Sequence, residues 1–80
     1  MSTLPVTREP LAIAVDVSQT ALHIVLADGR ELSAPLAWFP RLLHATDAER
    51  LEWRLIGGGI GIHWPAVDED ISVASLLRAH

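Results

Sequence analysis

Acidic side chains are densest near the end of the chain, in the run Asp68-Glu69-Asp70. The first and third of these, with Ser72, take the first, third and fifth positions of a calcium-binding loop. That loop needs a glycine next and a glutamate at its twelfth position, where the chain has Val73 and Ala79. The run therefore fails as a calcium site. A solvated loop, whose carboxylates favour the N-terminus of a following helix, is the simpler interpretation. Recognition of a protein partner is the functional alternative.

His63 lies five residues before Asp68 and is a candidate metal ligand or general base. A catalytic zinc site normally needs three protein ligands. The other histidines, at positions 23, 44 and 80, fall on separate predicted elements, and no His-x-x-x-His pair is present. We therefore expect no metal and no cofactor, and we interpret His63 as a structural residue that bonds a backbone group. A pocket of His63 with Asp68 and Asp70 is the alternative, and would support a small metal-dependent enzyme.

The glycine-rich stretch at 57–61 invites comparison with phosphate-binding loops. A dinucleotide fingerprint would need glycine where Ile62 stands, and a helix should follow it. The residues after the glycines predict a strand, so we interpret the stretch as a hairpin turn. The serines lack the setting of a nucleophile elbow, and we expect no catalytic residues.

Four aromatic residues are present: Trp38, Phe39, Trp53 and Trp64. In so small a domain most of them should lie in the core. Tryptophan and arginine are also enriched among the residues that dominate binding energy at interfaces. An exposed Trp38-Phe39 pair beside Arg41 is therefore our first candidate anchor for a partner. With Asp68, Glu69 and Asp70 it makes up the predicted partner-binding set.

Length and composition limit the possible functions. Eighty residues form one domain, and half of them are apolar, which is enough for one core and leaves apolar surface for a partner or a second copy. The formal charge is −4, with scattered arginines and no lysine. This balance disfavours direct binding to nucleic acid and favours a basic protein partner. The chain has no cysteine, signal peptide or membrane span, so we expect a cytoplasmic protein.

The first half predicts an antiparallel meander after an extended lead-in over residues 1–10. From Leu11 to Val17 apolar residues alternate, with Leu11, Ile13, Val15 and Val17 on one face. Residues 22–27 repeat the alternation. Asp28-Gly29 is a strong hairpin signal, and a third strand follows over 30–34.

The second half predicts short helices and another hairpin. Pro40 can open a helical turn, and Thr46 with Glu49 fits a capping box, with a break near Ala45. Residues 53–56 and 60–64 predict the hairpin, 68–70 a polar loop, and Ser72 the cap of a final helix. Ile71 and Leu76 are placed as a hydrophobic staple around that cap. The expected class is α+β, in the order βββ-α-ββ-α.

Several motifs of the second half resemble the bacterial family called domain of unknown function 2442. They are Trp38-Phe39-Pro40-Arg41-Leu42, Trp53-Arg54-Leu55-Ile56-Gly57, Gly61-Ile62-His63-Trp64-Pro65 and Asp68-Glu69-Asp70-Ile71-Ser72. The resemblance covers nearly the whole chain and implies a small α+β fold. Members have been proposed as antitoxins of two-gene modules, and no catalytic residues carry over.

Three functions follow as hypotheses. The first is a regulatory protein that binds a partner, in the antitoxin-like form neutralising a toxin encoded next to it by covering the toxin's active surface. The second is a dimeric transcriptional regulator associated with DNA, which the charge disfavours. The third is the small metal-dependent enzyme, supported only by His63 with Asp68 and Asp70.

Overall fold

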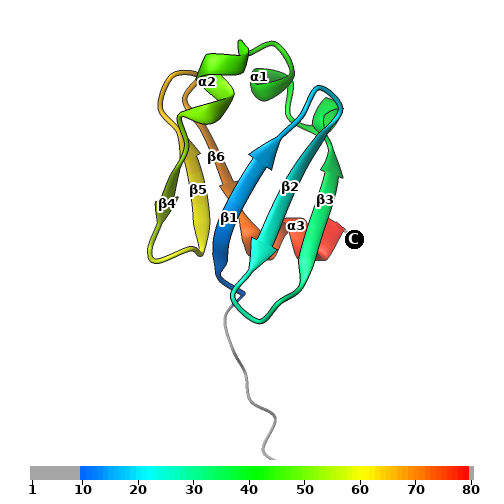
Figure 1. Ribbon diagram of the computed structural model, residues 1–80, viewed down its shortest axis with the longest axis vertical. Coiled ribbons are helices and arrows are strands. Elements are labelled where there is room, and N and C mark those ends of the chain that lie inside the picture. The colour runs from blue at the N-terminus through cyan, green and yellow to red at the C-terminus, as the bar shows by residue number, and fades with distance from the viewer. Residues whose placement is uncertain (1–9, 80) are drawn as a thin grey trace, which may run out of the picture.

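The computed structural model describes residues 10–79, which form two three-stranded antiparallel sheets and three short α-helices. The elements are β1 (Ala12–Val17), β2 (Ala21–Leu26), β3 (Glu31–Pro35), the 3₁₀ turn η1 (Leu36–Trp38), α1 (Pro40–Leu43), α2 (Asp47–Leu51), β4 (Arg54–Ile56), β5 (Gly61–Trp64), β6 (Glu69–Ser72) and α3 (Val73–Ala79). The predicted α+β class is confirmed (Figure 1). Residues 1–9 of the predicted lead-in, and His80, lie outside the described residues.

The first sheet has the order β1-β2-β3 and follows the predicted meander. The alternation in β2 buries Leu22, Ile24 and Leu26 on the inner face. The β2–β3 turn uses Gly29 at a φ of 94°. The main-chain N–H of Arg30 donates to the Asp28 carboxylate at 3.0 Å, and its guanidinium donates at 2.8 Å. These bonds hold the pKa of Asp28 below its ordinary value of 3.8, the backbone bond contributing most.

The predicted face of β1 is wrong in its first half. A bulge shifts the register between Ala12 and Ala14. As a result Ala12 is buried, and Ile13 is 58% exposed rather than facing the core. Val15 and Val17 keep the predicted inner face, because they lie opposite Ile24 and Leu22.

The two helices α1 and α2, which we call the helical excursion, begin and break where the sequence predicts. Pro40 is the first residue of α1, where its missing N–H costs no helical hydrogen bond. Thr46 and Glu49 form both bonds of the capping box at the start of α2. The Thr46 hydroxyl accepts from the Glu49 N–H at 3.1 Å, and the Glu49 carboxylate accepts from the Thr46 N–H at 2.8 Å.

The second sheet has the order β4-β5-β6 and one strand more than the predicted hairpin. The residues Glu69–Ser72, expected as part of a loop and a helix cap, pair antiparallel with β5 as β6. Only Ile71 of this strand is buried, so its apolar alternation is too short to signal a strand. The predicted cap of the last helix is confirmed, because the Ser72 hydroxyl accepts from the Ser75 N–H at 3.3 Å.

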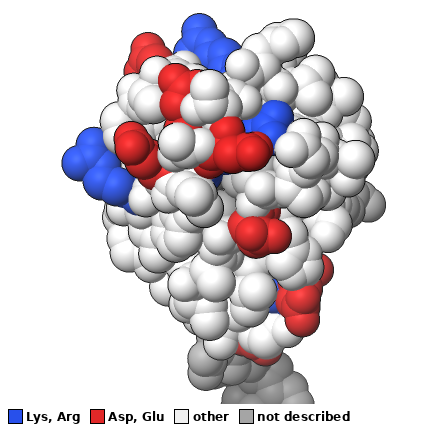
Figure 2. Space-filling view, turned by 45° about the horizontal axis from the view of Figure 1, so that its top comes forward, with Lys and Arg blue, Asp and Glu red and all other residues white. Residues whose placement is uncertain are grey.

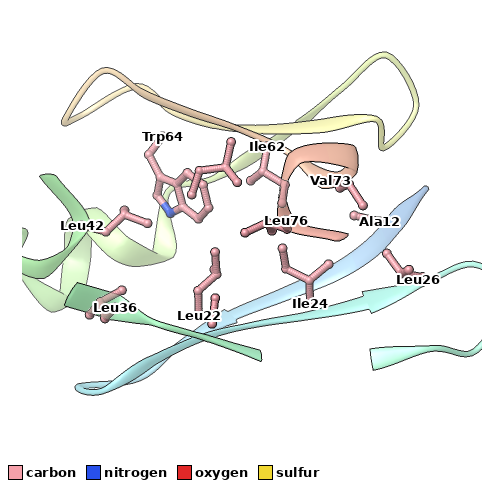
Figure 3. Packing of buried hydrophobic residues seen from close by; sticks show 12 residues of the cluster. Ala12, Leu22, Ile24, Leu26, Leu36, Leu42, Ile62, Trp64, Val73 and Leu76 are labelled. Carbon is pink, nitrogen blue, oxygen red and sulfur yellow. The ribbon is translucent and has the colours of Figure 1, made fainter. Parts of the chain in front are cut away.

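The two sheets face each other and enclose one core, with α3 at one side (Figures 1 and 3). Figure 3 shows side chains from both layers pointing toward one another, with Trp64 and Ile62 on one side and Leu22 and Ile24 on the other. Ile71 and Leu76, the predicted staple pair, both belong to this core. Among residues 10–79, no helix is long and apolar enough to cross a membrane.

A buried arginine joins the helical excursion to the second sheet. Arg50 is 6% exposed, and its guanidinium donates to the carbonyls of Leu42 and Leu43 at 3.0 and 2.9 Å. Its own carbonyl accepts from the indole N–H of Trp64, which is fully buried, at 3.1 Å. This Arg50–Trp64 junction gives hydrogen-bond partners to the buried Arg50 guanidinium and the buried Trp64 indole N–H.

The turn between β4 and β5 is pressed against the start of β1. Gly59 is buried at a φ of 116°, and its carbonyl accepts from the Ala12 N–H at 2.8 Å. A Cβ atom on Gly59 would lie 2.4 Å from the carbonyl oxygen of Ala12. The glycine run is thus the predicted turn, and one glycine in it also makes the contact that joins the two sheets.

We predict that Gly59→Ala destabilises the fold severely, because its Cβ would collide with backbone that cannot rotate away. The loss should be about 3 kcal/mol or more, a fall in Tm of roughly 12 °C or more. Gly58→Ala is the matched control, since Gly58 has a φ of 73° but open space around its Cβ. It should cost only about 1–2 kcal/mol. Thermal melts of both variants check this, and equal losses would contradict it.

We also predict that Trp64→Phe costs about 2–3 kcal/mol, because the Arg50 carbonyl loses its donor and the core loses ring volume. The control is Trp53→Phe, since Trp53 is partly buried at the margin of the core. That change should cost less than about 1 kcal/mol. Urea unfolding of the two variants measures the difference. A similar midpoint shift for both would mean that the indole bond contributes little.

A candidate partner-binding surface

Two segments far apart in the sequence meet on one surface of the molecule. Trp38, Phe39 and Asp70 line the same hollow of about 320 Å³, whose floor includes Ile71 and Leu76. We call it the Trp38 hollow. At its border the Arg41 guanidinium donates to the Asp68 carbonyl at 2.5 Å. The residues predicted to bind a partner therefore form one surface instead of two.

The aromatic half of this surface is held by a short turn between two prolines. Leu36, the first residue of η1, is fully buried and fixes the turn to the core. Trp38 is then left 49% exposed, while Phe39 is partly buried against the core. A rigidly mounted and half-exposed tryptophan can offer a large contact area at little entropic cost.

The acidic half is carried by β6 and the turn before it. Asp68 stands in the turn at a φ of 53°, a left-handed conformation that aspartate tolerates better than most residues. The Glu69 carboxylate accepts from the Asp70 N–H at 3.0 Å. Asp68 and Asp70 are exposed, and Glu69 is half-buried. Their negative charge can attract a basic surface, and salt will weaken that attraction.

His63 contacts Asp70 rather than the backbone group that the sequence led us to expect. Its Nδ1 lies 2.5 Å from the Asp70 carboxylate, on directly opposite residues of β5 and β6. Such non-hydrogen-bonded pairs of an antiparallel ladder bring side chains close together. Within the described part of the chain, no group of three or more His, Cys, Asp or Glu side chains could hold a metal ion. The His63–Asp70 pair therefore does not extend to Asp68 as a three-ligand site.

The other two described histidines do not line the Trp38 hollow. His23, in β2, contacts Ser33 and Glu31 of β3 at 3.0 and 2.8 Å through its two ring nitrogens. His44 is the exposed C-cap residue of α1. The two side chains belong to different elements, as the sequence predicts.

Charged side chains are unevenly spread over the molecule. On the face seen in Figure 2, acidic side chains gather towards the top, with arginines at their margin, and much of the remaining face is uncharged. Among the described residues, several large apolar side chains are also exposed, including Ile13, Ile56 and Ile60. A surface of this kind suits a protein partner better than a phosphate backbone.

Sequence reasoning missed a second hollow, of about 440 Å³, next to the first. It lies beside Gly61, which has no side chain to fill it, and Ile56, Ile60 and Ala74 form much of its apolar lining. We call it the Gly61 hollow. Asp70, Ile71 and Ser72 line both hollows. Exposed isoleucines on either side of a glycine run were the available signal. The hollow is completed by Asp70, Ile71 and Ser72 of β6, a strand that the sequence did not predict.

Comparison with known proteins supports the resemblance seen in the sequence. The structure is similar to the crystal structure of a protein of unknown function from Rhodospirillum rubrum ATCC 11170, with a TM-score of 0.75 and 27% sequence identity. That likeness covers 90% of this chain and 89% of the other. No curated protein matches the chain. A family model described as "Protein of unknown function (DUF2442)" matches residues 12–80, and the chain therefore belongs to the DUF2442 family.

Proposed function

We propose that this chain is a regulatory protein that works by binding another protein through the surface around Trp38. The observation that supports the proposal is the meeting of Trp38 and Phe39 with Asp70 at one hollow, next to the bond from Arg41 to the Asp68 carbonyl. In the form that the family resemblance suggests, the partner is a toxin-like protein encoded next to this chain. Binding would then neutralise the partner by covering its active surface.

The hollow is an anchor point and too small to be the whole interface. A stable protein–protein interface buries about 800 Å² on each partner. A half-exposed tryptophan at the centre of such an area can contribute most of the binding energy, while surrounding contacts exclude water. The neighbouring Gly61 hollow and its exposed isoleucines supply further apolar area on the same chain.

Charge favours a basic partner. The chain has a formal charge of −4, Asp68 and Asp70 are exposed, and Asp70 lines the same hollow as Trp38. Opposite charges accelerate the diffusional encounter of two proteins and select the orientation in which they meet. Arg41 stands within the same surface, but its guanidinium is engaged with the Asp68 carbonyl. A partner with arginine or lysine side chains thus meets carboxylates next to an aromatic ring.

Co-expression with the product of the adjacent gene tests the function itself. We expect that the neighbour alone stops growth, that this chain restores growth, and that the two proteins purify together. Gly59→Ala is a useful control, because a chain that cannot hold its fold should not rescue growth. If the adjacent gene product does not stop growth and does not purify with this chain, the antitoxin-like form of the proposal is refuted.

Substitutions on the surface test its assignment. Trp38→Ala should weaken the complex by about 30-fold or more, as expected for an anchor worth about 2 kcal/mol. Asp68→Asn, Glu69→Gln and Asp70→Asn together should slow association and flatten its salt dependence. Leu51→Ala is the control, because Leu51 is an apolar residue of α2 that is 76% exposed. Titration calorimetry and stopped-flow measurements check these effects. If Trp38→Ala and the triple variant both bind normally, the partner uses another face.

A further inference from the structure

The outer edge of β6 presents main-chain groups that no described strand pairs with. β6 is the end strand of its sheet, and it pairs with β5 in the register Ile62–Ile71 and His63–Asp70. The Val73 N–H donates to the Ile60 carbonyl in the same register. Because hydrogen-bonded pairs alternate along an antiparallel ladder, Glu69 and Ile71 bond to β5, and the main-chain groups of Asp70 and Ser72 point away from it.

The two hollows adjoin at this edge, because residues of β6 line both. Asp70 and Ser72 line both, so a chain laid along β6 would pass between them. Side chains of an added strand point alternately to the two faces of a sheet. One side chain of such a strand would meet the apolar lining beside Ile56, and the next would meet Trp38. Hydrogen bonds along the edge would supply affinity, and the hollows would supply selectivity.

The charge of β6 argues against a second copy of this chain as the occupant. Two β6 strands side by side would bring Glu69 and Asp70 of one copy close to the same carboxylates of the other. Like charges facing each other across paired strands are destabilising, and charged side chains on an edge protect it from self-pairing. A basic strand would instead gain from the same carboxylates and from Trp38, whose ring can hold a cation.

We propose that an extended, basic segment of a protein partner adds to the second sheet as a strand along β6. This inference rests on the proposed function, since it assigns that partner's binding mode. The segment carries apolar and basic side chains in alternation. Its main chain bonds to Asp70 and Ser72, and its carbonyl replaces the Glu69 carboxylate that now accepts from the Asp70 N–H.

A synthetic peptide tests the edge without knowledge of the partner. A hexapeptide of alternating arginine and valine, capped at both ends, is titrated to millimolar concentration into the uniformly ¹⁵N-labelled protein. We expect slower hydrogen exchange at the amides of Asp70 and Ser72 and a shifted indole resonance of Trp38. The amide of Ile71 is the internal control, because it is already bonded to β5. A hexapeptide of alternating glutamate and valine should have no effect.

Two substitutions at one position separate main-chain from side-chain binding. Asp70→Ala and Asp70→Pro both remove the carboxylate, and only the second removes the outward N–H. Proline is tolerated on an edge strand when the missing N–H faces away from the ladder. We expect Asp70→Pro to bind the basic peptide about tenfold more weakly than Asp70→Ala. If a thermal melt shows that Asp70→Pro is unfolded, the test of strand addition is the protection of the Asp70 and Ser72 amides in the unsubstituted protein.

The outcomes also separate this inference from the proposed function. If the basic peptide does not slow hydrogen exchange at the amides of Asp70 and Ser72, strand addition is overturned, even if the adjacent gene product binds. If the basic peptide protects these amides but the adjacent gene product does not bind, strand addition at the edge is supported and the antitoxin-like role is refuted. A concentration-dependent dimer that protects the same amides in the absence of peptide would show that the edge takes a second copy, and would also overturn the proposal.

Discussion

The contact between the Arg50 backbone and the Trp64 indole is the constraint on which the candidate surface depends. The Arg50 guanidinium donates hydrogen bonds to the carbonyls of Leu42 and Leu43, at the C-terminal end of α1. Its carbonyl holds the indole N–H of Trp64 in β5. Arg50 therefore links the helical excursion to the second sheet. Arg41 lies in α1, Trp38 lies in the turn just before it, and Asp70 lies on the strand beside β5. The junction therefore connects the two halves of the surface, together with Leu36, which fixes the turn to the core.

Buried polar groups explain why this arrangement is specific. The C-terminal carbonyls of a helix have no partners within it, and burying them without donors would cost more than an exposed helix end would. A guanidinium supplies several donors in a fixed geometry, which suits it to this position. At the other end of the sheets, the close contact of Gly59 with Ala12 leaves no room for a side chain. Together the two contacts join the second sheet to the helical excursion and to the first sheet.

Local signals predicted the elements that depend on local chemistry. The Asp28-Gly29 turn, the alternation in β2, the first residue of α1 and the capping box of Thr46 with Glu49 all occur as expected. The same reasoning failed where pairing between distant residues decides the structure. The bulge in β1 reverses the expected exposure of Ile13, next to the point where Ala12 bonds to Gly59. β6 forms from residues with strong polar character because β5 offers them a ladder to complete.

The sequence by itself determined the α+β class, the turns and caps, the acidic balance and the residue types suited to binding a partner. It also placed Trp38 and Asp70 among the candidates, through composition and general interface statistics. Only the tertiary structure decided that these residues share one hollow, that His63 meets Asp70, and that the edge of β6 runs between two hollows. The physical reason is that caps and turns are set by hydrogen bonds within a few residues. A surface built from segments some thirty residues apart exists only after the core has brought the sheets together.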